Sequence, residues 1–231
     1  MGILDKLTGK EPKTGTEPVT ETFGSVDITG LFDPNVRDEK DFRNINASPL
    51  LQEAIADYQD PGNVEKRESF IFDSEMKMMS DFYLPYYWAA TYNFDKDNTE
   101  EAKKILLEGI KNCKVKSVLC RRLGEFYFLK GDVKDALYWF FTAVMADTGY
   151  TDYHSYSYLA YIYEAYGMIK ESEWSLRRAR GIIYKLLMQP AEYSEDKKNK
   201  IIDIAEKNKS DEMARKLEDF YQYSRPRLKN L

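Results

Sequence analysis

A pair of residues, one large and one small, recurs along the middle of the chain. The three pairs are Trp88–Ala89, Leu123–Gly124 and Leu159–Ala160, spaced 35 and 36 residues apart, and a tyrosine follows the large residue of each pair at the same distance. Antiparallel helices approach closely only where small side chains let their backbones meet. A repeat of this length therefore predicts a stack of helical hairpins, each of which buries its apolar face against its neighbours.

The second half of each copy carries further small residues. Ala102, Ala136 and Ser172 stand at matching positions, and each is followed four residues later by a large apolar residue. Gly131 and Gly167 lie between the two expected helices of the second and third copies, where glycine permits the left-handed backbone of a tight turn. We expect Asp132, and Asn98 or Thr99, to cap the helices that follow. The first copy has one extra residue between its helices, which we assign to a longer turn.

These positions resemble the tetratricopeptide repeat (TPR), a helix–turn–helix unit of about 34 residues. The second copy matches it best, with Leu123–Gly124, Tyr127, Ala136 and Phe140 in sequence. The resemblance covers a little under half of the chain. It implies an all-α, right-handed helical-hairpin solenoid of about three repeats, with a concave groove that binds polypeptides.

The rest of the chain divides around this array. We predict an extended or disordered acidic arm (1–47), N-terminal helices (48–82), three TPR-like repeats (83–190), and a C-terminal capping helix or helices with a tail (191–231). Ser48 and Pro49 begin a helix that ends near Tyr58, and a second helix follows from about 64 to 80. The arm is either a floppy tail or a segment that orders on a partner.

Two serines are candidate N-caps for helices in the C-terminal region. Ser194 caps a helix that runs towards Lys207, and Ser210 caps a second helix, unless the two form one long helix. The second helix places several apolar residues on one side, and residues 225–231 form a frayed basic tail. The apolar residues are Met213, Ala214, Leu217, Phe220 and Tyr221.

The charge balance bears on the class of partner. The net charge is −5 and the sequence pI is about 5.2, whereas nucleic-acid-binding domains are usually basic. Residues 1–62 hold 12 acidic and 6 basic side chains. A basic run (Arg177, Arg178, Arg180 and Lys185) keeps a nucleic-acid-associated protein as an alternative. Weak attachment to a membrane through residues 1–10 is another.

The residues needed for most catalytic sites are scarce. His154 is the only histidine, which excludes metal sites built on several histidines. Glycine-rich phosphate loops, nucleophile elbows and zinc-binding spacings do not occur. Cys113 and Cys120 fit a reduced, cytoplasmic protein, with Cys120 in the core of the repeat. We expect no enzymatic activity, no cofactor and no metal.

The TPR resemblance implies that the first helix of each repeat lines the groove. Tyrosine and arginine are enriched at protein interfaces, and the paired Arg121 and Arg122 can bind a carboxylate. The acidic arm would reach a second partner or fold back into this groove. Alternatively, many of the tyrosines only pack against neighbouring helices. The predicted groove residues are Tyr86, Tyr87, Arg121, Arg122, Glu125, Phe128, His154, Tyr158, Tyr161 and Glu164. The function that follows is a protein-binding adaptor or an accessory subunit of a larger assembly.

Overall fold

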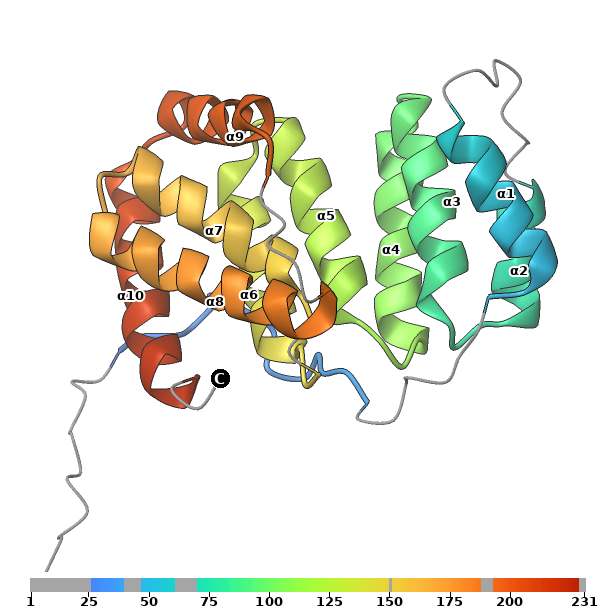
Figure 1. The fold of residues 1–231 in the computed structure, drawn as a ribbon, viewed down its shortest axis with the longest axis horizontal. Coiled ribbons are helices and arrows are strands. Elements are labelled where there is room, and N and C mark those ends of the chain that lie inside the picture. The colour runs from blue at the N-terminus through green and yellow to red at the C-terminus, as the bar shows by residue number, and fades with distance from the viewer. Residues whose placement is uncertain (1–25, 40–46, 61–69, 150, 188–192, 229–231) are drawn as a thin grey trace, which may run out of the picture.

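The computed structural model describes residues 26–39, 47–60, 70–149, 151–187 and 193–228, and every regular element in this part of the chain is a helix (Figure 1). The predicted all-α class is therefore confirmed. Within these ranges there are ten helices and no strand. They are α1 (Pro49–Gln59), α2 (Phe70–Met78), α3 (Tyr83–Asp95), α4 (Thr99–Asn112), α5 (Ser117–Leu129), α6 (Val133–Ala146), α7 (Tyr153–Ala165), α8 (Ile169–Leu187), α9 (Glu195–Lys207) and α10 (Asp211–Arg227).

Three consecutive pairs of helices, α3–α4, α5–α6 and α7–α8, form hairpins with short turns of equal length. The middle residue of each turn has a left-handed backbone: Asp97 with φ 63°, Gly131 with φ 84° and Gly167 with φ 74°. The two glycines were predicted there, and the structure confirms them. Asp97 is the only non-glycine residue with positive φ in the described ranges. Aspartate tolerates this conformation better than most residues because its short side chain can bond to nearby backbone.

The expected longer turn in the first hairpin was wrong. Counted from the turn, the position of Gly124 in α5 corresponds to Ala90 in α3, one residue beyond the small residue chosen from the sequence. Ala89 and Ala90 are both fully buried. Because Ala89 and Ala90 are adjacent, the large–small pattern alone does not decide which of them corresponds to Gly124. The pattern predicted Ala89, whereas the position of the turn identifies Ala90.

Close approach within the hairpins depends on residues without bulky side chains. A Cβ atom added to Gly124 would lie 2.9 Å from the Phe140 ring and 3.2 Å from the carbonyl oxygen of Ala136. At Gly109, an added Cβ would lie 2.8 Å from Leu119 and 2.9 Å from Tyr86. These separations are shorter than ordinary van der Waals contact, so α5 fits against α6, and α4 against its neighbours, only because glycine stands there.

Two apolar cores hold the helices together. One lies among α1 to α6, where Phe94 of α3 stacks on Phe126 of α5 with ring centroids 4.0 Å apart. The other lies among α5 to α10, where Phe141 stacks on Phe220 at 3.8 Å. The Tyr163 hydroxyl donates a hydrogen bond to the Leu217 carbonyl at 2.9 Å. Helix α10 therefore closes the end of the stack beyond the third hairpin (Figure 1).

The described part of the arm docks on the chain itself. Leu31 and Phe32 are buried in the second core. One carboxylate oxygen of Asp38 accepts the N–H groups of Lys116 and Ser117 at 2.7 and 2.8 Å, and the other accepts the Ser117 hydroxyl at 2.6 Å. A carboxylate in this position satisfies unpaired N–H groups at the start of α5 and complements the helix dipole. Residues 26–39 are thus neither a floppy tail nor a segment that needs a partner, while 1–25 and 40–46 lie outside the described residues.

The predicted serine caps are present. Ser48, Ser194 and Ser210 each accept a hydrogen bond from a backbone N–H in the first turn of α1, α9 and α10. The alternative of one long C-terminal helix was wrong. Asn98 and Asp132 precede α4 and α6 as expected, but their side chains make no capping hydrogen bond.

Helix α10 runs further towards the C-terminus than the sequence predicted. A frayed tail from Arg225 was wrong, because α10 continues through Pro226 to Arg227. Arg227 fixes this last turn: its Nη1 donates to the Tyr223 carbonyl at 2.7 Å, and its guanidinium lies 3.7 Å above the Tyr223 ring. The start of the second helix, predicted near residue 64, lies outside the described residues. No helix in the described ranges has both the length and the apolar character needed to cross a bilayer.

Replacing Gly124 with valine should destabilise the protein by about 1–3 kcal/mol, because the new side chain overlaps Phe140 and the Ala136 carbonyl. Gly181→Ala is the matched control, since a Cβ at Gly181 in α8 meets nothing within 4 Å. The control should gain about 0.5–1 kcal/mol from helix propensity. Urea unfolding followed by circular dichroism measures both. Wild-type stability in Gly124→Val would contradict the packing described here.

Candidate functional site

Several of the predicted groove residues meet where the first helices of the three hairpins approach one another. Helix α3 contacts α5, and the Phe128 ring of α5 meets the Tyr158 ring of α7 with centroids 5.8 Å apart. We call the side chains gathered there the arginine–tyrosine cluster. Its members are Tyr87, Arg121, Arg122, Glu125, His154 and Tyr158.

Arg121 is the buried centre of the cluster, with 10% of its side chain exposed. Its Nη1 donates a hydrogen bond to Glu125 Oε1 at 2.7 Å. Its Nε lies 3.2 Å from Oδ1 of Asp152, close enough for an ion pair but not aligned for a hydrogen bond. Asp152 also caps α7 by accepting the Ser155 backbone N–H. Because a buried guanidinium requires opposite charge nearby, Arg121 ties α5 to the start of α7.

The two carboxylates of this network, Glu125 and Asp152, have pKa values that are shifted in opposite directions. Burial disfavours the charged form of Glu125, but the guanidinium groups of Arg121 and Arg122 outweigh it and lower the pKa of Glu125 to about 2. Burial raises the pKa of Asp152 to about 6, against the opposing effect of Arg121. At neutral pH both acids are therefore ionised and matched by the two arginines.

Arg122 links the first hairpin to the second. Its Nη1 donates to Glu125 Oε2 at 2.7 Å, and its Nε donates to the Thr91 hydroxyl of α3 at 3.1 Å. The guanidinium also lies 5.2 Å from the centre of the Tyr87 ring and 4.8 Å from that of Phe126. With 18% of its side chain exposed, Arg122 stays in contact with the surface, unlike Arg121.

A segment of the chain's own C-terminal region covers the α7 side of the cluster. The hydroxyl of Tyr193 lies 2.8 Å from His154 Nδ1, and the Tyr193 ring is 5.9 Å from that of Tyr158. Lys197 Nζ sits 3.7 Å from the centre of the Tyr193 ring. Helix α9 packs on α7, where Lys198 pairs with Glu164 at 3.3 Å. These residues were not predicted, because no local pattern shows that a terminal helix will fold back on α7.

Tyr86 and Phe128 lie in the protein interior. The Tyr86 ring contacts Gly109, and its hydroxyl donates to the Ser80 carbonyl at 3.2 Å. The Phe128 ring packs beside Phe140 and Tyr158. Tyr158 and Tyr161 are also buried. The alternative in which tyrosines pack against neighbouring helices thus describes Tyr86, Tyr158 and Tyr161.

Partial exposure remains for four of the predicted groove residues. Tyr87, Arg122, His154 and Glu164 are each half-buried. Tyr87 is the predicted residue of the first hairpin that reaches the cluster. The centre of its ring lies 5.9 Å from the guanidinium carbon of Arg121 and 5.2 Å from that of Arg122. The part of the predicted groove that stays accessible beside the cluster is therefore built mainly from Tyr87 and Arg122.

The cysteines and acids show no arrangement of metal ligands within the described ranges. Both cysteines are buried. Burial raises the pKa of the Cys113 thiol to about 12, and that of Cys120 also lies well above its ordinary value. Both groups are therefore neutral thiols, which are poor nucleophiles.

Comparison of this chain with protein-family models, with curated proteins and with solved structures found no match. The TPR resemblance therefore rests on the repeat pattern in the sequence.

The stability of the protein should depend on the protonation of His154. Burial, with help from the Arg121 charge, lowers the pKa of His154 to about 3 from its ordinary 6.5. The folded chain thus binds fewer protons than the unfolded chain between these values, and stability falls as the pH drops below 6.5. Between pH 7 and 5 wild type should lose about 2 kcal/mol more than the His154→Gln variant.

Comparing the two proteins isolates the histidine. Asp152 acts in the opposite direction, since its pKa of about 6 lets the folded chain take up a proton first as the pH falls. Asp152 is present in both proteins, so its contribution cancels in the difference. Urea unfolding at several pH values gives the two curves. Parallel curves would show that His154 is not shielded from protonation.

Proposed function

We propose that this protein is a TPR-like adaptor or accessory subunit that binds a partner polypeptide at the surface formed by α3 and α5 beside the arginine–tyrosine cluster. The observation that supports this most directly is the docking of Tyr193 on His154, Tyr158 and Tyr161. The inner faces of the hairpins thus have the chemistry to hold an aromatic side chain of a polypeptide. A partner would use the part that Tyr193 and Lys197 leave uncovered.

The repeated turn geometry supports the TPR-like part of the proposal. All three hairpins turn through a left-handed residue, and these residues recur about every 35 positions along the chain. Repeats of this kind stack in register, so equivalent positions of α3, α5 and α7 present their side chains side by side. A continuous strip of surface is what a bound segment of a partner requires.

The charges and the aromatic ring at this surface determine which side chains a partner could bring to it. Glu125 already occupies both arginines, so a partner carboxylate would have to compete with a buried acid whose two hydrogen bonds are each 2.7 Å long. Tyr87, in contrast, is half-buried with Arg122 against its ring. Aromatic rings and arginine dominate binding energy at many interfaces. The partner segment would therefore bring an apolar or aromatic side chain to Tyr87 and Arg122.

A cytoplasmic location belongs to the same proposal. It is supported by the two cysteines, which are unpaired and buried as neutral thiols.

Photo-crosslinking in the native host tests the proposed surface. A crosslinking amino acid placed at Tyr87 should capture one discrete polypeptide. The same amino acid at Tyr184, which is 63% exposed on α8, is the control and should not capture it. With the captured partner purified, Tyr87→Ala and Arg122→Gln should each weaken binding by roughly tenfold or more, as expected for interface hot spots.

The controls separate lost binding from lost folding. Each variant should keep its helical circular dichroism, and Tyr184→Ala should bind the partner as wild type does. Equal capture from positions 87 and 184 would contradict the proposed surface. Nucleic acid that co-purifies at moderate salt in place of a polypeptide would favour the nucleic-acid alternative.

A further inference from the structure

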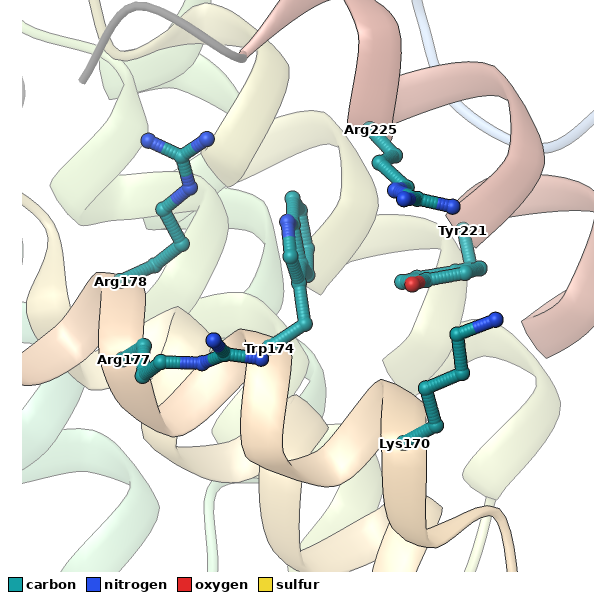
Figure 2. A pocket seen from close by; sticks show the side chains of 6 residues that line it. All are labelled: Lys170, Trp174, Arg177, Arg178, Tyr221 and Arg225. Carbon is teal, nitrogen blue, oxygen red and sulfur yellow. The ribbon is translucent and has the colours of Figure 1, made fainter.

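A second feature lies on the other side of the third hairpin, between α8 and α10. Here six side chains line a pocket of about 360 Å³. Figure 2 shows the indole of Trp174 in the middle, with the other residues of α8 beside it and the two residues of α10 facing it. The lining residues are Lys170, Trp174, Arg177, Arg178, Tyr221 and Arg225. A volume of this size is at the lower end of small-ligand sites.

The pocket collects positive charge in a chain whose net charge is −5. Four of the six lining residues are cationic. Within the part of the chain that the structure describes, no carboxylate forms an ion pair with Lys170, Arg177 or Arg225, and all three are exposed. The charges of Glu171 and Glu218 reach Tyr221, but these acids do not pair with the three cations. Cations gathered in this way repel one another unless an anion neutralises them.

The charge count favours a ligand with at least two negative charges. A single carboxylate is satisfied by one arginine fork, whereas a phosphate group offers more oxygen atoms and more charge to several donors. Lys170 and Arg177 come from one helix and Arg225 from another, so a phosphate between them would be held from both sides. This arrangement contrasts with the arginine–tyrosine cluster, where carboxylates of the chain match the arginines.

Two aromatic rings form the apolar part of the pocket. The Trp174 and Tyr221 rings are perpendicular, with centroids 5.5 Å apart. Tyr221 is buried, while Trp174 is half-buried, and both rings line the pocket. Arg178 lies 5.5 Å from the centre of the Trp174 ring. An indole at the edge of a cationic site can stack on a flat ring, as aromatic residues do in many sites that bind nucleobases.

We propose that the pocket between α8 and α10 binds a mononucleotide, with its phosphates at Lys170, Arg177 and Arg225 and its base against Trp174. The cations gather around one aromatic platform and do not extend along a line of such platforms. This favours a single nucleotide over a nucleic-acid strand. The site is separate from the surface proposed for the partner polypeptide, so either proposal can fail without the other.

Calorimetric titration of the full chain with adenosine diphosphate tests the site. We expect one molecule bound per chain with a Kd below about 1 mM. Arg177→Gln and Arg225→Gln should each weaken binding at least roughly tenfold, because each removes a charge-assisted contact to phosphate. Arg180→Gln is the matched control: it removes a cation from the same helix outside the pocket, and binding should not change.

Partial ligands separate the two halves of the site. Trp174→Leu should weaken the binding of adenosine diphosphate but leave that of pyrophosphate unchanged, and adenosine alone should bind at least roughly tenfold more weakly than the diphosphate. Unchanged unfolding temperatures show that the variants remain folded. No binding of adenosine diphosphate, or equal binding by wild type and Arg177→Gln, would overturn the proposal. So would binding only to vesicles that contain phosphoinositides, or only to a single-stranded oligonucleotide.

Discussion

The close approach of paired helices is the constraint on which the rest of the structure depends. Gly124 leaves no room for a side chain between α5 and α6, because Phe140 and a backbone carbonyl occupy that space. Gly109 does the same for α4 against Tyr86 and Leu119. With the helices this close, the side chains of α3, α5 and α7 are brought within contact of one another. The arginine–tyrosine cluster is thus a consequence of small residues elsewhere in the hairpins.

The buried Arg121 then determines how neighbouring hairpins are joined. A guanidinium without solvent is stable here only because Glu125 and Asp152 lie beside it, and Asp152 also begins α7. Removing one partner would leave an uncompensated charge in the interior. The network consequently specifies one arrangement of α5 relative to α7, and it uses two of the residues that sequence alone assigned to partner binding.

Features encoded by local chemistry could be predicted from the sequence. The left-handed glycines at 131 and 167 and the serine cap at residue 194 follow from single residues and their immediate neighbours. Contacts between distant segments could not be predicted. Asp38 reaches the start of α5 and Tyr193 folds back on His154, although no periodicity links either pair. The burial of Tyr86, Phe128 and Tyr158 could not be predicted for the same reason: helical spacing gives the face of a residue but not what covers that face.

The two proposed sites differ in how their cations are balanced. In the cluster, Arg121 and Arg122 are held by acids of the same chain at 2.7 Å. In the pocket between α8 and α10, Arg177 and Arg225 are exposed beside aromatic rings without such partners. Burial forces charges to pair within the protein, whereas exposed charges are under no such requirement. Lys170, Arg177 and Arg225 form no ion pair with a carboxylate of the described residues, so the proposed nucleotide would find these three cations open to solution.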